Sequence, residues 1–392
     1  MNLFSDALPF GWLWHNRPFH LAIGIFICFG AGVFLLLVSL VTPLHTVAAD
    51  AAGNRDFGEL VDIGGGRKMY LECRGSGSPT VLLISGEAGA ATAWTMGDPA
   101  RPAPTVFDEV AKFTRVCAYD RPGALVDLAG GKTKPSRSDP VSQPTTSQDA
   151  VRDLHALLRA ASERGPYVLV GHSFGGLVAR LYASAYPNEV TGMVLVDPAS
   201  EAFQAALLRL KAYDTWKATR TGGRLSLTAD QLAQYPELER LDYDRSFAQL
   251  RAAAPLRSMP LILLSSDHSI QKALEPLIAA GKLPPGIPAD FGLTVDKAWK
   301  EGQDHDAKLV PNARHITKTD SSHNIQLEQP RLVIDAIRQV VQAVRNQSPP
   351  PRGRQRNSIR HAVRHFQLAG AGGAFDGTFR AKQQAKASAG LS

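Results

Sequence analysis

The stretch from Tyr167 to Tyr186 reads YVLVGHSFGGLVARLYASAY, and it decides the fold class. Its first four residues form an apolar, aromatic and β-branched run that is typical of a buried strand. A helix-like periodic segment, GLVARLYASAY, follows after a short turn. The sequence therefore predicts a strand, a sharp turn and a helix in immediate succession.

The turn itself, Gly171-His172-Ser173-Phe174-Gly175, has the G-x-S-x-G pattern. In a strand-to-helix turn of this kind the glycines leave room where side chains would collide with the neighbouring strand and helix. The serine hydroxyl is pushed out at the carboxyl edge of the sheet. Ser173 is thus the candidate nucleophile, and the backbone amide of Phe174 is a candidate donor to a developing oxyanion.

Apolar, strand-like runs alternate with helix-like segments on both sides of this turn, which predicts an α/β fold with a mostly parallel sheet covered by helices. The expected helices are Thr146–Ala161, with a capping box at Thr146, and Arg331–Val344. The other expected strands are Thr80–Ile84, Val116–Tyr119, Gly192–Val196, Leu261–Leu264 and His315–Lys318.

About sixty residues separate the strands that end at Val196 and begin at Leu261, which is too many for one crossover. Helix-like segments near Ala202–Lys217 and Ala229–Ala253 lie within this stretch. We interpret residues 198–259 as an inserted helical cap.

Four stretches resemble parts of the α/β-hydrolase fold family, in the family's order. PTVLLISG and TRVCAYDRPG are similar to its third and fourth strands, PYVLVGHSFGGLVARLYASAYPNEVTGMVLVDP to its nucleophile region, and SSHNIQLEQPRLVIDAI to its histidine loop. The resemblance covers residues 57–345. It implies an eight-stranded sheet, a helical cap after the sixth strand, and the order serine, acid, histidine along the chain.

A serine hydroxyl needs a base, and the base needs a third group that fixes its tautomer. His323 lies in the polar loop where the family places its catalytic histidine. Asp267 follows the strand PLILLSS, where the family most often has its acid, and is our expected third member. Asp197 follows the preceding strand and is the alternative, although Asp197-Pro198 could equally be a turn that caps the next helix.

The second oxyanion donor is expected in the loop after the third strand, Ser85–Gly89, as the backbone amide of Glu87. Many relatives have His-Gly at this point, and a carboxylate here would oppose catalysis unless it turned away. The resemblance implies a serine hydrolase that cleaves small carboxylic esters through an acyl-enzyme without an organic cofactor. The alternatives are an amide, peptide or carbon–carbon bond hydrolase or an acyltransferase on the same residues, and a non-catalytic binding module.

Three cysteines and the absence of a Cys-x-x-Cys pair or a His-Glu-x-x-His run give no indication of a metal site. The resemblance places Cys73 and Cys117 on neighbouring strands, and either a disulfide or two buried thiols fits. The formal net charge of +7 resides in the segment 346–392, where eight arginines and lysines face one acid. The remaining body is neutral, which argues against nucleic-acid binding by the folded domain.

Residues 21–41 form an uncharged apolar run long enough to cross a bilayer, after a flank at 1–20 and before a linker at 42–56. We expect a membrane anchor, and a signal peptide cleaved after Val47–Ala49 is the alternative. Both place the catalytic domain outside the cytoplasm. The basic tail, 346–392, has no apolar periodicity and is expected to be disordered. Nothing in the sequence indicates an oligomeric state.

Overall fold

The structure, a computed structural model, describes residues 55–97, 103–128, 132–217, 237–283 and 286–347. Within these ranges, no helix combines the length and the apolar character that a membrane span requires. The apolar run 21–41 and the tail beyond residue 347 lie outside the described residues, and so do the predictions made for them.

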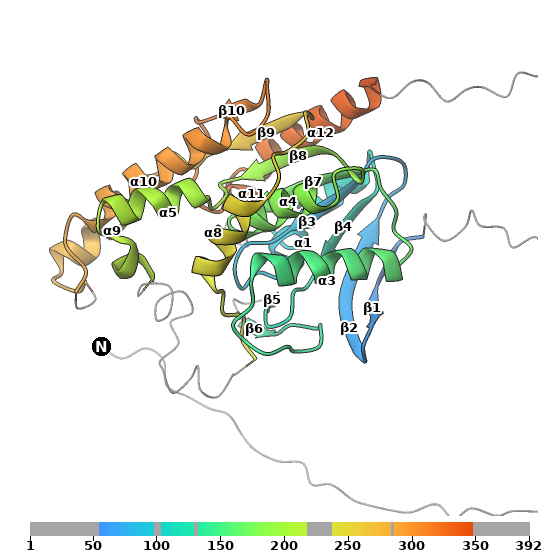
Figure 1. Ribbon diagram of the computed structural model, residues 1–392, viewed down its shortest axis with the longest axis horizontal. Helices are drawn as coiled ribbons and strands as arrows, with labels where there is room; N and C mark the ends of the chain where they lie inside the picture. The colour runs from blue at the N-terminus through green and yellow to red at the C-terminus, as the bar shows by residue number, and fades with distance from the viewer. Residues whose placement is uncertain (1–54, 98–102, 129–131, 218–236, 284–285, 348–392) are drawn as a thin grey trace, which may run out of the picture. The chain divides into compact units, whose positions relative to one another are not determined.

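An eight-stranded sheet forms the centre of the fold, in the order β1-β2-β4-β3-β7-β8-β9-β10 (Figure 1). All neighbouring pairs from β4 to β10 are parallel, whereas β2 is antiparallel to both β1 and β4. This confirms the predicted mostly parallel sheet. The strands are β1 (Phe57–Gly64), β2 (Arg67–Arg74), β3 (Thr80–Ile84), β4 (Val116–Tyr119), β7 (Tyr167–His172), β8 (Val190–Val196), β9 (Leu261–Leu264) and β10 (Arg314–Ile316).

The inner strands are buried on both faces, which explains why they are continuous apolar runs. Along β3, Leu82 and Ile84 belong to one hydrophobic core, and Val81 and Leu83 to the other. Alternate side chains of a strand point to opposite faces, so each strand contributes to both cores. Strand β10 ends earlier than predicted, because after Ile316 the chain turns into the loop that leads to His323.

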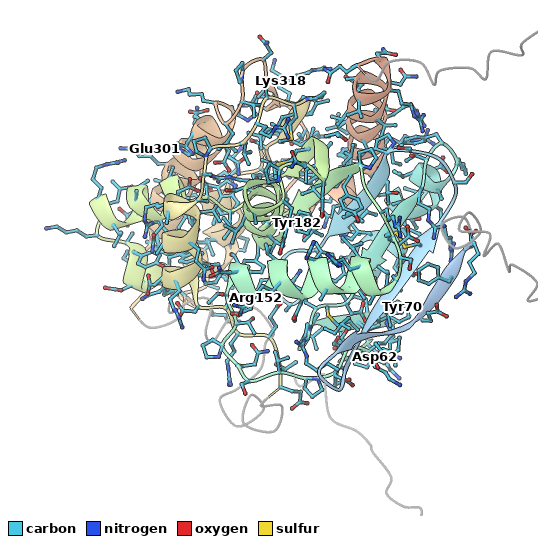
Figure 2. All side chains as sticks on the ribbon, turned by 45° about the vertical axis from the view of Figure 1, so that its right-hand side comes forward. Asp62, Tyr70, Arg152, Tyr182, Glu301 and Lys318 are labelled. Carbon is cyan, nitrogen blue, oxygen red and sulfur yellow. A yellow bond between two sulfur atoms is a disulfide. The ribbon has the colours of Figure 1, made fainter. Side chains whose placement is uncertain are left out.

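Helices cover both faces of the sheet. One core contains α3 (Ser147–Ala160) and α4 (Phe174–Ala185), and the other contains α2 (Val106–Ala111) and α12 (Pro330–Gln347). Figure 2 shows Tyr182 of α4 in the interior, where it is fully buried, and Lys318 on the surface.

Helix α3 begins as the sequence predicts. The Thr146 hydroxyl accepts the amide of Asp149, and the Asp149 carboxylate accepts the amide of Thr146. The capping box is confirmed, and it satisfies two backbone donors at the helix start.

The cap is larger than predicted. Helices α5 (Glu201–Arg209) and α8 (Tyr243–Ala252) come from the expected insertion between β8 and β9. A second segment, between β9 and β10, adds α9 (Ile270–Ala279) and α10 (Phe291–Asp306). Helices α5 and α10 lie side by side (Figure 1) and share close contacts around Gly302 and Phe203. The bounds 198–259 therefore miss part of the helical layer.

A disulfide joins Cys73 of β2 to Cys117 of β4, with Cα atoms 4.1 Å apart. The two cysteines are directly opposite one another in the antiparallel pair. Of the two alternatives that the sequence left open, the structure has the bridge. The smaller elements are α1 (Thr92–Thr95), α11 (Ile325–Glu328) and a two-stranded sheet of β5 (Leu125–Leu128) and β6 (Lys132–Pro135).

Candidate active site

Ser173 occupies the strained turn that the sequence predicts. Its φ is 53° and its ψ is −121°, a backbone conformation that residues other than glycine rarely adopt. A Cβ at Gly171 would lie 2.4 Å from the carbonyl oxygen of Gly175, and one at Gly175 would lie 2.2 Å from that of Ile84. Both glycines are therefore required by the close approach of β7, α4 and β3.

The sheet brings Ser173 next to the loops that follow two neighbouring strands. The amide of Ser173 donates to the carbonyl of Val196 at 3.1 Å, and the amide of Ala199 donates to the carbonyl of Ser173 at 3.0 Å. Asp197 directly follows Val196 and has a positive φ of 43°. The carboxyl ends of parallel strands meet at one edge, which is where ligands bind in open α/β sheets.

His323 pairs with Asp197 at this edge. Its Nδ1 lies 2.7 Å from Oδ2 of Asp197, whose side chain is 1 % exposed. The other carboxylate oxygen, Oδ1, accepts the Ser266 amide at 2.9 Å and the Trp299 indole N–H at 3.0 Å. A carboxylate at Nδ1 holds the proton there, which leaves Nε2 free to accept one.

Asp267 does not face His323, contrary to our expectation. It is exposed, and its carboxylate accepts the backbone amides of Thr319 at 3.1 Å and Ser321 at 3.0 Å. Burial alone would raise the pKa of Asp267, but these backbone bonds outweigh it and lower the pKa. The structure thus corrects the pairing: His323 has Asp197, the alternative, and Asp267 braces the loop that precedes the histidine.

His172 bonds to the loop that carries His323. Its Nε2 donates to the backbone carbonyl of His323 at 2.9 Å, and the two rings lie with their centroids 4.7 Å apart. The side-chain amide of Gln326 lies 3.5 Å from Nδ1. His172 is buried, and these contacts give it a packing role beneath the loop.

The loop after β3 lies against Ser173. A Cβ on Gly86 would be 3.1 Å from the Cβ of Ser173, so the backbone that precedes Glu87 adjoins the serine. The Glu87 carboxylate accepts the hydroxyl of Tyr243, on α8 of the cap, at 2.7 Å. This contact ties the Glu87 side chain to the cap.

The buried side chain of Arg121 bonds to the backbone of the loop after β3. It donates to the carbonyl of Ser85 at 2.8 Å, to that of Gly86, and to both carboxylate oxygens of Glu239 at 2.6 and 3.0 Å. Glu239 in turn accepts the amide of Ala88 at 2.5 Å. Burial alone would lower the pKa of Arg121, but Glu239 outweighs it and raises the pKa, so the guanidinium stays charged.

Asp120 and Arg121 are adjacent in the sequence and carry opposite charges. In the structure Asp120 instead pairs with Arg137 at 2.6 Å. The pairing of Arg121 with Glu239 joins residues far apart in the chain, and no local pattern indicated it.

A family model matches residues 81–336, and its description is "Alpha/beta hydrolase family". The chain belongs to the alpha/beta hydrolase family. The matched range includes the turn at Ser173, Asp197 and His323. Together with the sheet order, it makes the protein a hydrolase by family.

Several proteins are similar to this alpha/beta hydrolase. "Uncharacterized protein YqjL" of Bacillus subtilis is 25 % identical over 283 residues, 71 % of this chain and 89 % of that protein. "Lipase LipV" of Mycobacterium tuberculosis is 48 % identical over 60 residues, which cover 15 % of this chain and 23 % of that lipase. A solved structure of a thermophilic esterase from Thermogutta terrifontis has a TM-score of 0.44 at 20 % identity, covering 74 % of this chain and 99 % of the esterase.

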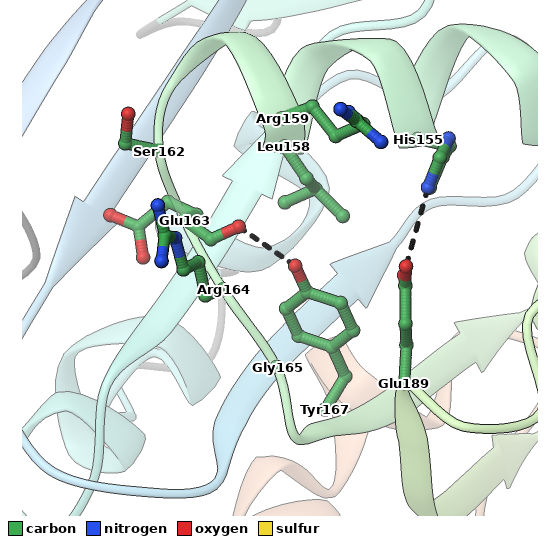
Figure 3. Close-up of a pocket in the computed structure, with 9 residues that line it drawn as sticks. All are labelled: His155, Leu158, Arg159, Ser162, Glu163, Arg164, Gly165, Tyr167 and Glu189. Carbon is green, nitrogen blue, oxygen red and sulfur yellow. Dashed lines mark hydrogen bonds and ion pairs between the residues drawn. The ribbon is translucent and has the colours of Figure 1, made fainter.

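A pocket of about 300 Å³ lies at the opposite end of β7 from the candidate active site of this alpha/beta hydrolase. Figure 3 shows its lining, with Tyr167 at the start of the strand and His155 paired with Glu189 at 3.3 Å. Active sites of open α/β sheets lie at the carboxyl ends of strands. We therefore do not assign the reaction to this pocket.

Among the described residues there are two groups of side chains whose potential metal-ligand atoms lie close to one another within each group. One contains Cys73 and Cys117, whose sulfurs are joined to each other. The other contains Glu201 and Asp306, and Arg180 already donates to both carboxylates, at 2.6 and 2.9 Å. A buried guanidinium would repel a metal cation there.

Proposed function

We propose that this protein hydrolyses carboxylic esters through an acyl-enzyme, with Ser173 as nucleophile, His323 as general base and Asp197 as the acid that orients the histidine. The observation that carries this proposal is the 2.7 Å pairing of His323 Nδ1 with the buried Asp197 carboxylate, next to the strained turn of Ser173. A base held in this tautomer can take a proton at Nε2.

In the proposed reaction, Ser173 Oγ attacks the ester carbonyl and its proton passes to His323. The negative charge on the carbonyl oxygen is stabilised by the backbone amides of Phe174 and Glu87. The histidine returns the proton to the leaving alcohol as the carbon–oxygen bond breaks. Water, deprotonated by the same histidine, then releases the acid and restores Ser173.

Labelling with a serine-reactive fluorophosphonate tests the nucleophile. The wild-type protein should be labelled at Ser173, and Ser173→Ala should lose both labelling and ester hydrolysis. Ser184→Ala is the matched control, because Ser184 lies on the same helix, α4, and its hydroxyl donates to the carbonyl of Ala254. A folded Ser173→Ala protein that kept its label would contradict the proposal.

A substrate panel tests the reaction class. We expect esters of graded acyl length to be hydrolysed in preference to matched amides, since an alcohol leaves more readily than an amine. Preferred cleavage of amides, or acyl transfer to an added alcohol that outpaces hydrolysis, would replace esterase by the corresponding alternative on the same three residues. The absence of any turnover and any labelling would favour a binding module.

We also propose that the catalytic domain functions outside the cytoplasm, anchored by residues 21–41 or released after their cleavage. Two observations support export: the uncharged apolar run and the Cys73–Cys117 disulfide, since such bridges form and persist in oxidising compartments. Fractionation of cells that express the full chain would test this, and full recovery in the cytoplasmic fraction would contradict it.

A further inference from the structure

Asp197 has two donors on the side away from His323, and one of them comes from the cap. The Trp299 indole N–H lies 3.0 Å from Oδ1, and the Ser266 amide lies 2.9 Å from the same oxygen. A carboxylate that is 1 % exposed cannot replace a lost partner with bulk water. Both donors therefore determine how the carboxylate is rotated toward the histidine.

Trp299 also touches the histidine. Its ring meets the ring of His323 edge to face, with centroids 5.5 Å apart and planes at 80°. One side chain thus contacts both members of the His323–Asp197 pair, through a hydrogen bond to one and a ring contact to the other.

Helix α10, which carries Trp299, is also bonded to the segments that directly follow β8 and β9. One turn further along α10, the Gln303 side chain donates to the carbonyl of Pro198 at 2.9 Å and accepts the Ser265 hydroxyl at 2.9 Å. On its other side the Trp299 ring packs edge to face on Phe203 of α5, with centroids 4.8 Å apart. The indole thus contacts Phe203 on one side and the His323–Asp197 pair on the other.

We propose that Trp299 is a positioning residue: it holds the Asp197 carboxylate in the orientation that keeps the proton of His323 on Nδ1. The inference rests on the proposed function. Trp299 transfers no proton in the proposed reaction and acts through its hydrogen bond to Asp197. This gives the second cap segment, between β9 and β10, an indirect role in the proposed reaction.

The test compares wild type with Trp299→Phe, which keeps an aromatic ring against Phe203 and His323 but has no N–H. We expect kcat to fall about tenfold, as for the loss of one hydrogen bond to a charged group, with KM nearly unchanged. The acid limb of the kcat/KM profile should move to higher pH, because a carboxylate with one donor fewer stabilises the imidazolium more strongly. In its described hydrogen bonds, His323 is the one titratable partner of Asp197. The other titratable ring beside His323 is that of His172, with centroids 4.7 Å apart.

A double-mutant cycle separates positioning from general damage. Trp299→Phe should have little further effect on the labelling rate in an Asp197→Asn background, whereas a merely structural role would give the same loss in both backgrounds. Trp299→His retains a ring N–H and should recover part of kcat above pH 8, where the new imidazole is neutral. Glu301→Gln, on the exposed side of α10 where Glu301 pairs with Arg209, is the matched control.

The outcomes are distinguishable. Unchanged kcat and pH profile in Trp299→Phe, with active wild type, would overturn the role of Trp299 and leave the proposed function intact. An equal loss in both backgrounds would also overturn it. A wild-type protein that neither reacts with the phosphonate nor hydrolyses any ester would instead refute the proposed function itself.

Discussion

Replacing Asp197 with asparagine should nearly abolish the proposed activity, and the structure explains why the amide would be held the wrong way round. Oδ1 accepts two N–H donors, from Ser266 and Trp299, so the amide oxygen must stay at that position. The amide NH₂ then faces His323 Nδ1 and requires that nitrogen to be unprotonated. The proton moves to Nε2, where it blocks the transfer from Ser173. We expect kcat to fall by about 10⁴, the loss that the same change produces in the serine-protease template.

The assay is steady-state hydrolysis of a short-chain ester, with fluorophosphonate labelling as a second readout. Asp267→Asn is the matched control, because Asp267 is also an aspartate at the end of a neighbouring strand but bonds to the amides of Thr319 and Ser321. It should lower kcat less than tenfold. If Asp267→Asn were instead the more damaging change, the acid would be Asp267 and the assignment of Asp197 would be refuted.

Three further predictions concern stability and the tail. Replacing Cys73 and Cys117 with alanine should lower the free energy of unfolding by about 4 kcal/mol, from the loop entropy of a 44-residue separation, as measured by denaturant titration. The pKa of His305 is raised above 6.5, mainly by its bond to Asp306, so its contribution to stability is complete below pH 6.5 and is lost as the pH rises through the folded-state pKa. His305→Asn should therefore flatten the stability profile in that window, and an unchanged profile would refute this. Deletion of 348–392 should leave kcat unchanged, because every proposed catalytic residue precedes it; a large loss in folded protein would contradict this.

The local parts of the fold could be predicted because the residues that form them are adjacent in the sequence. The strand and turn around Ser173 need an apolar run and two glycines, and the structure gives both glycines a steric reason. The same holds for the capping box at Thr146, where the two partners are three residues apart. In each case the interacting groups are close in sequence, so their pattern carries the structure.

The acid could not be chosen in this way. Asp197 and Asp267 both follow buried strands at the same edge of the sheet, and both precede His323 in the chain. What separates them is the direction of the side chain. Backbone amides of the loop after β10 donate to the Asp267 carboxylate, whereas the Asp197 carboxylate bonds to His323 and to Trp299 of α10. The two aspartates therefore differ because of the backbone amides in the loop after β10. No side-chain pattern in the sequence marks these amides.

The contacts that brace the candidate site also cross between distant segments. Glu239, from the first cap segment, binds Arg121 and the amide of Ala88, and Trp299, from the second, binds Asp197. Such pairs are favourable only in the assembled fold, since each partner alone would be a buried charge or an unsatisfied polar group. An exchange of the cap for that of a relative would therefore remove supports of both the oxyanion loop and the acid, even though none of the proposed catalytic residues lies in either cap segment.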